Sequence, residues 1–370
     1  MKLFCLIMLC FVVSFSCNYA NRPFIKIFSS LDGRLFVDGV DKGFIKAGKD
    51  NIKKIPVSSG ELLIVIKSVD KKDIIDTIIR INQKDMVLYL NLNSVRNDRI
   101  NFEREIENLE KNMVTVEGGS FNMGCTENDE LCEDSERPAH KVNVSSFKIS
   151  KYEVTLRQFD LFIKKSGYET TSEKEGWSWT WEKVNKSTYQ WKKKDGLNWM
   201  TDDQGKKINE SDFEQPVNFV SWLDAQAFCE WLSKETGKKY RLPTESEWEF
   251  AARGGNKTKG YIYSGSNNFD RVAWFYNNSY DEIHKVGFKA PNELGLYDMS
   301  GNVWEWCSVW QSEYKTSEYN YPTGSEKKEN KVLRGGGFDK HSRYCRVSAR
   351  VFFPPSYRTR NDGFRIVQIP

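Results

Sequence analysis

The residues that could carry chemistry are concentrated in one stretch, residues 295–306, with the sequence GLYDMSGNVWEW. Asp298 and Glu305 offer carboxylate oxygens that could bind a metal ion. Gly295 and Gly301 allow backbone conformations that other residues resist, and the stretch lacks helical or strand periodicity. It is therefore interpreted as a structured loop, which could be a catalytic core, a metal-held scaffold or only a packed segment.

Histidine and cysteine restrict the chemistry further. The three histidines, His140, His284 and His341, are far apart in the sequence, which argues against a His-rich zinc site. Neither His284 nor His341 lies near a recognisable catalytic-triad motif. Among the eight cysteines, Cys125 and Cys132 share one polar, acidic segment and form the favoured disulfide pair.

Composition excludes one class of partner. The chain has 370 residues with 55 Lys and Arg against 51 Asp and Glu, giving a formal charge of only +4. A nucleic-acid-binding protein is expected to show a marked basic excess, so no nucleic-acid partner is predicted. Aromatic residues make up 14% of the chain and include 12 Trp, which predicts a substantial core and an aromatic-lined site.

The N-terminus predicts export. Residues 1–17 begin with a short positive segment, continue through an apolar run too short to span a membrane, and end at Cys17. The small residues before Cys17 resemble a bacterial lipoprotein signal, in which this cysteine would be lipidated. A plain secretory signal cut nearby is the alternative. Either interpretation predicts the bacterial cell envelope, lipid-anchored or secreted, where disulfides are stable.

Two segments precede the main domain. Residues 24–95 contain repeated short apolar runs separated by Gly, Asp and Lys turns, which predict a small all-β, antiparallel sandwich. The order of these runs resembles the PEGA family of small β modules. Residues 96–113 place Phe102, Ile106, Leu109 and Met113 at helical spacing and predict an amphipathic linker helix.

Residues 114–370 differ in composition from the preceding segments, because they contain short motifs rich in Trp, Gly and Asn. Thr155 and Ser221 are N-cap residue types before predicted helices, the second of which should stop at Gly237. Thr244 and Glu247 form a capping-box pattern that predicts a third helix.

The motifs VEGGSFNMG, PVNFVSW, YRLPTESEWEFAAR, ELGLYDMSGNVWEW, VLRGGGF and NDGFRIV occur in that order within residues 114–370. Together they resemble the formylglycine-generating enzyme (sulfatase-modifying factor) family. The resemblance implies an α+β domain with a large variant of the C-type lectin fold, preceded here by the small all-β module.

The resemblance implies a copper site formed by two cysteine thiolates, which select Cu(I) because they are soft ligands. In this sequence the first thiolate position falls on Lys340. Cys345 matches either the second thiolate or an ordinary core position. Copper is therefore not expected, and a non-catalytic protein is favoured over a copper-dependent formylglycine-generating oxidase acting on sulfatase cysteine.

The resemblance also implies Ca²⁺ in the opening stretch. The side chains of Asp298 and Glu305 and the backbone carbonyls of Gly301 and Val303 would be its ligands, since a hard cation prefers several oxygens. The alternative is that Asp298 caps a turn and Glu305 forms a salt bridge. The alternation of Trp304 and Trp306 predicts that both lie in the core on one strand face.

The predicted ligand-binding residues lie between the family motifs at the C-terminus, in a region that resembles the ligand-facing part of diversified C-type-lectin-fold proteins, including surface lipoproteins of treponemes. They are aromatic, apolar or polar side chains expected on surface loops: Phe338, Asp339, His341, Tyr344, Phe352, Phe353, Ser356 and Tyr357. The alternative is that Phe352, Phe353 and Tyr357 pack internally. The expected partner is a protein or a glycan, and a structural role in an envelope complex stays open.

Overall fold

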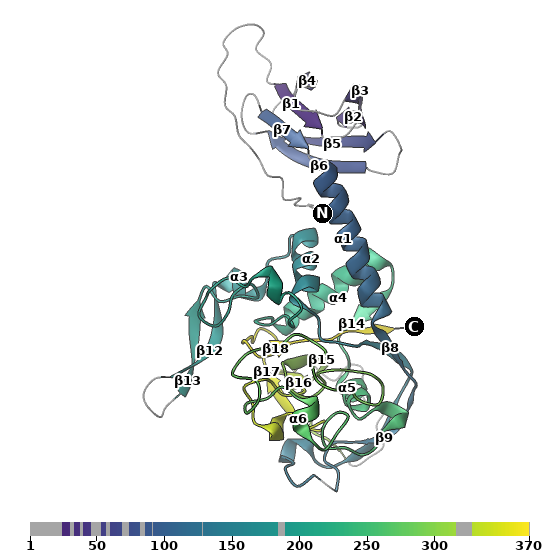
Figure 1. Cartoon of the computed structure of the whole chain (residues 1–370), viewed down its shortest axis with the longest axis vertical. Coiled ribbons are helices and arrows are strands. Elements are labelled where there is room, and N and C mark those ends of the chain that lie inside the picture. Colours follow the sequence, from purple (N-terminus) through teal and green to yellow (C-terminus); the bar gives the residue numbers. More distant parts are fainter. Residues whose placement is uncertain are drawn as a thin grey trace. The chain divides into compact units, whose positions relative to one another are not determined.

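The computed structural model describes residues 24–29, 33–37, 40–45, 53–56, 60–68, 74–81, 86–90, 92–127, 129–183, 189–315 and 328–369 (Figure 1). The predicted leader, residues 1–17 with Cys17, lies outside these ranges. The chain divides into two compact units, Met1–Asn108 with Lys164–Gly167, and Leu109–Ile163 with Tyr168–Pro370.

The first unit contains two β-sheets followed by a helix. Its strands are β1 (Phe24–Ser29), β2 (Gly33–Val37), β3 (Val40–Ile45), β4 (Lys53–Pro56), β5 (Gly60–Ser68), β6 (Ile74–Ile81) and β7 (Met86–Leu90). The sheet orders are β4-β1-β7 and β3-β2-β5-β6. The prediction of a purely antiparallel module is wrong in one place, because β1 and β7 pair in parallel. Parallel partners need a crossover connection, and the chain between β1 and β7 passes through the other sheet, which contains β2, β3, β5 and β6.

Helix α1 spans Leu92–Lys111 and therefore begins before the predicted linker helix at residue 96. Its first turn carries the polar residues Asn93 and Ser94, which do not show the apolar periodicity on which the prediction was based. The helix ends immediately before β8 of the second unit. Within the described residues, no helix is both long and apolar enough to cross a membrane.

The second unit combines two four-stranded sheets, two hairpin sheets and short helices, in agreement with the expected α+β fold. The sheet orders are β14-β19-β11-β8, β17-β16-β15-β18, β10-β9 and β12-β13. The strands are β8 (Met113–Val116), β9 (Gly119–Met123), β10 (His140–Val144), β11 (Phe147–Ser150), β12 (Trp177–Lys183), β13 (Tyr189–Asp195), β14 (Lys239–Arg241), β15 (Trp304–Trp310), β16 (Lys331–Arg334), β17 (Arg350–Phe353), β18 (Asp362–Gly363) and β19 (Val367–Ile369).

The helices of the second unit are α2 (Leu156–Ser166), α3 (Thr171–Glu175), α4 (Trp222–Thr236), α5 (Glu245–Ala252) and α6 (Phe269–Val272). The capping predictions are confirmed. The Ser221 hydroxyl accepts a hydrogen bond from the Asp224 backbone at the start of α4, and Gly237 ends that helix in the left-handed conformation. Thr244 and Glu247 form the predicted capping box of α5.

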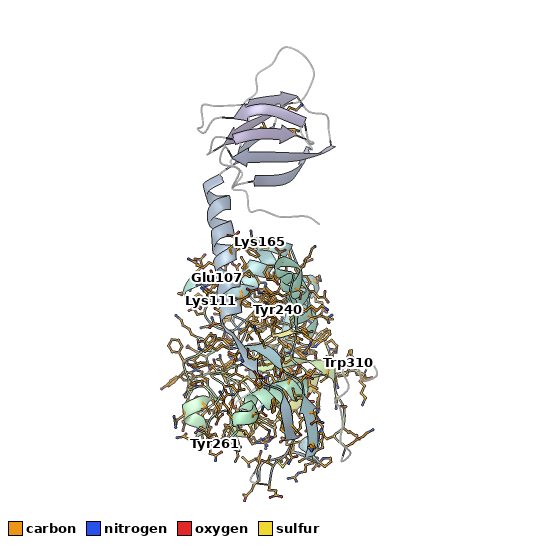
Figure 2. The ribbon with its side chains drawn as sticks, turned by 90° about the vertical axis from the view of Figure 1, so that its right-hand side faces the viewer. Glu107, Lys111, Lys165, Tyr240, Tyr261 and Trp310 are labelled. Carbon is orange, nitrogen blue, oxygen red and sulfur yellow. A yellow bond between two sulfur atoms is a disulfide. The ribbon has the colours of Figure 1, made fainter. Side chains whose placement is uncertain are left out.

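The core of this unit contains many buried aromatic side chains. Figure 2 draws the described side chains of the unit as sticks. Phe159 and Phe162 of α2 pack against Phe228 of α4, with ring centroids 6.1 and 5.7 Å apart. Phe364, which follows β18, closes the same cluster at 5.4 Å from Phe228. Because aromatic rings bury large apolar areas, this cluster ties the C-terminal segment to the two longest helices of the unit.

Candidate functional site

The stretch of residues 295–306 forms a tight loop that leads into β15. Gly301 has a φ of 84°, and a Cβ atom there would clash with the carbonyl oxygen of Trp274. Only glycine combines this conformation with such a close backbone approach. Trp304 and Trp306 are both buried, as predicted for a strand face directed into the core. The loop is therefore fixed on one side by Trp274 and on the other by β15.

Three buried carboxylates surround one buried guanidinium beside this loop. Arg365 donates to Glu305 through Nε to Oε2 at 2.6 Å and through Nη2 to Oε1 at 2.7 Å. The indole nitrogen of Trp248 also donates to Glu305 Oε2, at 2.7 Å. Glu153 comes from the segment after β11 and accepts from the Asn302 side chain at 2.8 Å. Asp298 Oδ2 accepts from the Gly287 backbone at 2.7 Å.

Two features of these residues determine whether they fit Ca²⁺. Asp298 Oδ1 is buried and has no hydrogen-bond partner among the described residues. The ionised forms of Glu153, Asp298, Glu305 and Arg365 carry a net charge of −2, which a divalent cation would balance. The three donors at Glu305 still leave one lone-pair direction on Oε1. These residues therefore fit a cation at Asp298, although Glu305 already forms the salt bridge that was the alternative prediction.

Without a cation, the same charges favour proton uptake. Burial is the main cause that raises the pKa of Glu153 well above its ordinary value, and the Asp298 and Glu305 carboxylates raise it further. Burial also raises the pKa of Asp298 to about 6, against the opposing effects of the Gly287 hydrogen bond and Arg365. A buried negative charge must be neutralised by a proton, a cation or a basic side chain. Arg365 pairs directly with Glu305, and half-buried Lys289 lowers the pKa of Asp298 without a direct ion pair.

The residues at the two thiolate positions do not fit a copper ion. Cys345 is fully buried in an apolar cluster with Tyr263, Val272 and Phe275, and burial raises the pKa of its thiol to about 12. Gly336 has a φ of 82°, and a Cβ atom there would lie 2.7 Å from Cys345 Sγ. The other position holds Lys340, whose Nζ lies 3.1 Å from Asp339 Oδ1. A protonated core thiol beside an ammonium group lacks the two thiolates that Cu(I) requires.

The predicted ligand-binding residues divide into buried, half-buried and exposed groups. The expected surface position of Phe338 is wrong, since its side chain is only 1% exposed and its ring centroid lies 4.9 Å from the Arg360 guanidinium carbon. Asp339 and Tyr344 are half-buried, whereas His341 and Ser356 are exposed. His341 lies against Tyr276, with ring centroids 5.1 Å apart.

Strand β17 separates the two neighbouring phenylalanines. Phe352 packs against the main apolar core, so it follows the internal alternative. Phe353 points to the other face and stacks on Tyr357, with ring centroids 3.9 Å apart and planes only 6° from parallel. This division follows from the two-residue repeat of a strand, which directs successive side chains to opposite faces.

Sequence reasoning missed two residues that extend this stack. Trp191 of β13 lies 6.1 Å from Tyr357 and 5.1 Å from Trp181 of β12. Trp181 and Trp191 are 47% and 39% exposed, and the hairpin that carries them projects from the rest of the unit (Figure 1). The regular alternation of Trp177, Trp179 and Trp181 with polar residues is the strand signal that would have located them. We call Trp181, Trp191, Tyr357 and Phe353 the aromatic row.

Cys125 and Cys132 form a disulfide with their Cα atoms 5.8 Å apart. The loop that they close holds Asp129, whose carboxylate accepts from Arg346 at 2.6 Å, and Glu136 accepts from the same guanidinium at 2.6 Å. Asp129, Cys132 and Glu136 place ligand-type atoms within 4.8 Å of one another. Because Arg346 occupies both carboxylates and the sulfur is in a disulfide, this cluster is an internal clamp and not a metal site.

Comparisons with known proteins identify the family of the domain. Residues 100–369 match the sulfatase-modifying factor enzyme 1-like domain. The chain is 34% identical over 300 residues to a formylglycine-generating enzyme of Thermomonospora curvata, which covers 72% of this chain and 96% of that protein. The chain belongs to the sulfatase-modifying factor family.

Relatives of this sulfatase-modifying factor domain include proteins with different activities. An inactive C-alpha-formylglycine-generating enzyme 2 of Bos taurus is 34% identical over 284 residues, covering 69% of this chain and 87% of that protein. The solved structure of Treponema denticola variable protein 1 is similar with a TM-score of 0.53 and 25% identity, covering 70% of this chain and 95% of that one. Family membership therefore identifies the fold, whereas the activity has to be inferred from the residues of the site.

Proposed function

We propose that this sulfatase-modifying factor domain is a non-catalytic binding module that recognises a protein or glycan ligand on its C-terminal loops. The observation that carries the proposal is the state of the two thiolate positions, a core thiol at Cys345 and an ammonium group at Lys340. A formylglycine-generating oxidase is the alternative function, and it would require copper chemistry that these side chains do not support.

The aromatic row supports a binding surface in place of that chemistry. Contiguous exposed apolar side chains mark interaction sites. Here exposed Trp191 lies beside the stacked pair of Phe353 and Tyr357, and exposed Trp181 lies against Trp191. Stacked rings are rigid, so they offer contact area with little loss of conformational entropy on binding. Exposed Ser356 and half-buried Asp339 and Lys340 supply polar groups near these rings. This combination suits either a protein surface or the faces of sugar rings.

Replacing Trp191 by alanine is expected to weaken ligand binding at least thirtyfold, corresponding to about 2 kcal/mol for a central aromatic contact. The full chain would first be used to identify ligands on a glycan array and by pull-down from solubilised cell envelopes. The affinity of each variant for an identified ligand would then be measured by interferometry. Phe288→Ala is the matched control, because Phe288 is exposed but lies outside the aromatic row. Equal losses in both variants, or O₂-dependent aldehyde formation on a thiol peptide with Cu(I), would contradict the proposal.

We further propose that Ca²⁺ binds at Asp298, with the Gly301 and Val303 carbonyls and the free lone pair of Glu305 as its other ligands. The orphaned Asp298 oxygen and the buried net charge of −2 support it. Saturating Ca²⁺ at about 100 times its Kd is expected to add about 2.7 kcal/mol to the free energy of unfolding, which calorimetry with and without chelator would measure. Asp298→Asn should lose this response, while Glu117→Gln, at an exposed carboxylate, should retain it. An equal Ca²⁺ response in wild type and Asp298→Asn would reject the site.

We infer that the chain is exported and anchored through a lipid on Cys17. The Cys125–Cys132 disulfide supports export, since such bonds persist in oxidising compartments. Mass spectrometry of the mature protein is expected to find a lipidated N-terminal Cys17, and Cys17→Ser should release the protein from membranes. An unmodified N-terminus at another residue would indicate the plain secretory signal instead.

A further inference from the structure

A concave site on the second unit shares no residue with the aromatic row. It is a cavity of about 510 Å³ bounded by the segment of residues 201–219, the loop of residues 280–283, and the side chains of Phe338 and Arg360. Neither Lys340 nor Cys345 lines it, and no member of the aromatic row does. Its volume is within the range typical of small-ligand pockets.

Arg360 holds the walls of this cavity together. Its guanidinium pairs with Asp203 at 2.9 Å and with Asp281, and it covers the Phe338 ring. These contacts join three separate segments of the chain. The positive charge of Arg360 is therefore engaged with two wall carboxylates and is not available to an acidic ligand.

The remaining charge of the cavity is negative. Its lining contains the carboxylates of Asp202, Asp203, Asp212, Asp281 and Glu282 against the cations of Lys206, Lys207 and Arg360, for a net charge of −2. A concave surface with one excess sign focuses the field and attracts ligands of the opposite sign.

The cavity also contains an acceptor that lacks a donor. Asn218 lines it and is only 3% exposed, and its Oδ1 has no hydrogen-bond partner among the described residues. A buried acceptor without a donor is unfavourable, so a donor-bearing group that reached Asn218 would stabilise the site. At the rim, Tyr280 is 86% exposed and holds a φ of 59°, a conformation uncommon for a bulky residue. Its ring is thus displayed where a cation could lie over it.

We propose that this cavity binds a cationic side chain, the guanidinium or ammonium group of an arginine- or lysine-bearing peptide. Asn218 Oδ1 and the Asp212 carboxylate accept from its N–H donors, Glu282 balances its charge, and Tyr280 covers it at the rim. This site is independent of the aromatic row, so either can fail while the other holds.

The test uses the full chain and four capped tripeptides, acetyl-Gly-Xaa-Gly-amide, in which Xaa is arginine, lysine, citrulline or glutamate. Citrulline keeps the shape of arginine and lacks its charge. Titrations followed by amide chemical shifts are expected to show binding of the arginine and lysine peptides, at least tenfold weaker binding of citrulline, and none of glutamate. The affinity of the cationic peptides should fall as salt is raised.

Two variants locate the interaction. Asp212→Asn and Glu282→Gln are each expected to weaken the arginine peptide at least fivefold, whereas Glu117→Gln, at an exposed carboxylate outside the cavity, should leave it unchanged. Unchanged circular dichroism would show that the variants fold. Equal affinity for arginine and citrulline, no binding at millimolar peptide, or full affinity in both cavity variants would overturn the proposal.

Discussion

Replacing Arg365 by methionine is expected to lower the free energy of unfolding by about 3–5 kcal/mol, the range for breaking a buried ion pair. The Arg365 guanidinium is fully buried and donates to both oxygens of Glu305 and to the carbonyls of Ser150 and Tyr297. Its loss leaves Glu153, Asp298 and Glu305 near one another without the buried guanidinium that pairs with Glu305, and half-buried Lys289 acts only on Asp298. Urea denaturation at neutral pH in the presence of chelator would measure the change.

Arg157→Met is the matched control for that experiment. Arg157 pairs with Glu214 at 2.8 Å, but both side chains are exposed. Solvent screens such a pair, so the expected loss is below about 1 kcal/mol. Similar losses in the two variants would show that burial of Arg365 does not set its contribution. Arg365→Lys should fall between them, since it keeps the charge and loses the paired geometry.

Asp362→Asn is expected to remove a large part of the pH dependence of stability. The Asp362 carboxyl is buried beside β15, and burial raises its pKa from 3.8 to about 7, against the hydrogen bond donated by Thr359. Because the folded state holds the proton more tightly than the unfolded chain, this group stabilises the fold fully below pH 4. That contribution is lost as the pH rises through 7.

In wild type, this group should lower the free energy of unfolding by about 2–4 kcal/mol between pH 4 and pH 8. Asp362→Asn should lack that decrease, because the amide does not ionise. Urea denaturation at a series of pH values would measure the difference in slope. Thr359→Val provides a control of opposite sign, since removal of the hydroxyl donor should raise the pKa of Asp362 and make the decrease larger. Parallel pH profiles for wild type and Asp362→Asn would exclude this role.

Local signals made much of the domain predictable. The cap residues Ser221 and Thr244 and the stop at Gly237 depend on backbone groups within a few positions, and the sequence contains all of them. The family motifs supplied the fold. In contrast, Glu153 meets Asn302 and Val303 across about 150 positions, and no periodicity connects such distant residues. The balance of buried charges around Asp298 could therefore not be predicted from the sequence of residues 295–306 alone.

The C-terminal loops show a second reason why the binding residues could be predicted only in part. Residue type indicated aromatic contacts, but type does not say which face of a strand a ring occupies. Phe352 and Phe353 are identical and adjacent, and only the register of β17 against β16 assigns one to the core and the other to the stack with Tyr357. In the hairpin that carries Trp181 and Trp191, aromatic and polar residues alternate along the first strand. This strand could therefore have been predicted from the sequence.

The position of β19 has a consequence for the order of folding. This three-residue strand, Val367–Ile369, lies between β14 and β11 in its sheet and pairs with both. During synthesis, β11 emerges more than 200 residues before β19, so this sheet cannot be completed until nearly all of the domain has left the ribosome. Contacts of such long range are slow to form, which exposes the unfinished sheet to aggregation in the interval. Because the chain is proposed to be exported, a factor that keeps it unfolded until Val367–Ile369 is available would matter most for this domain.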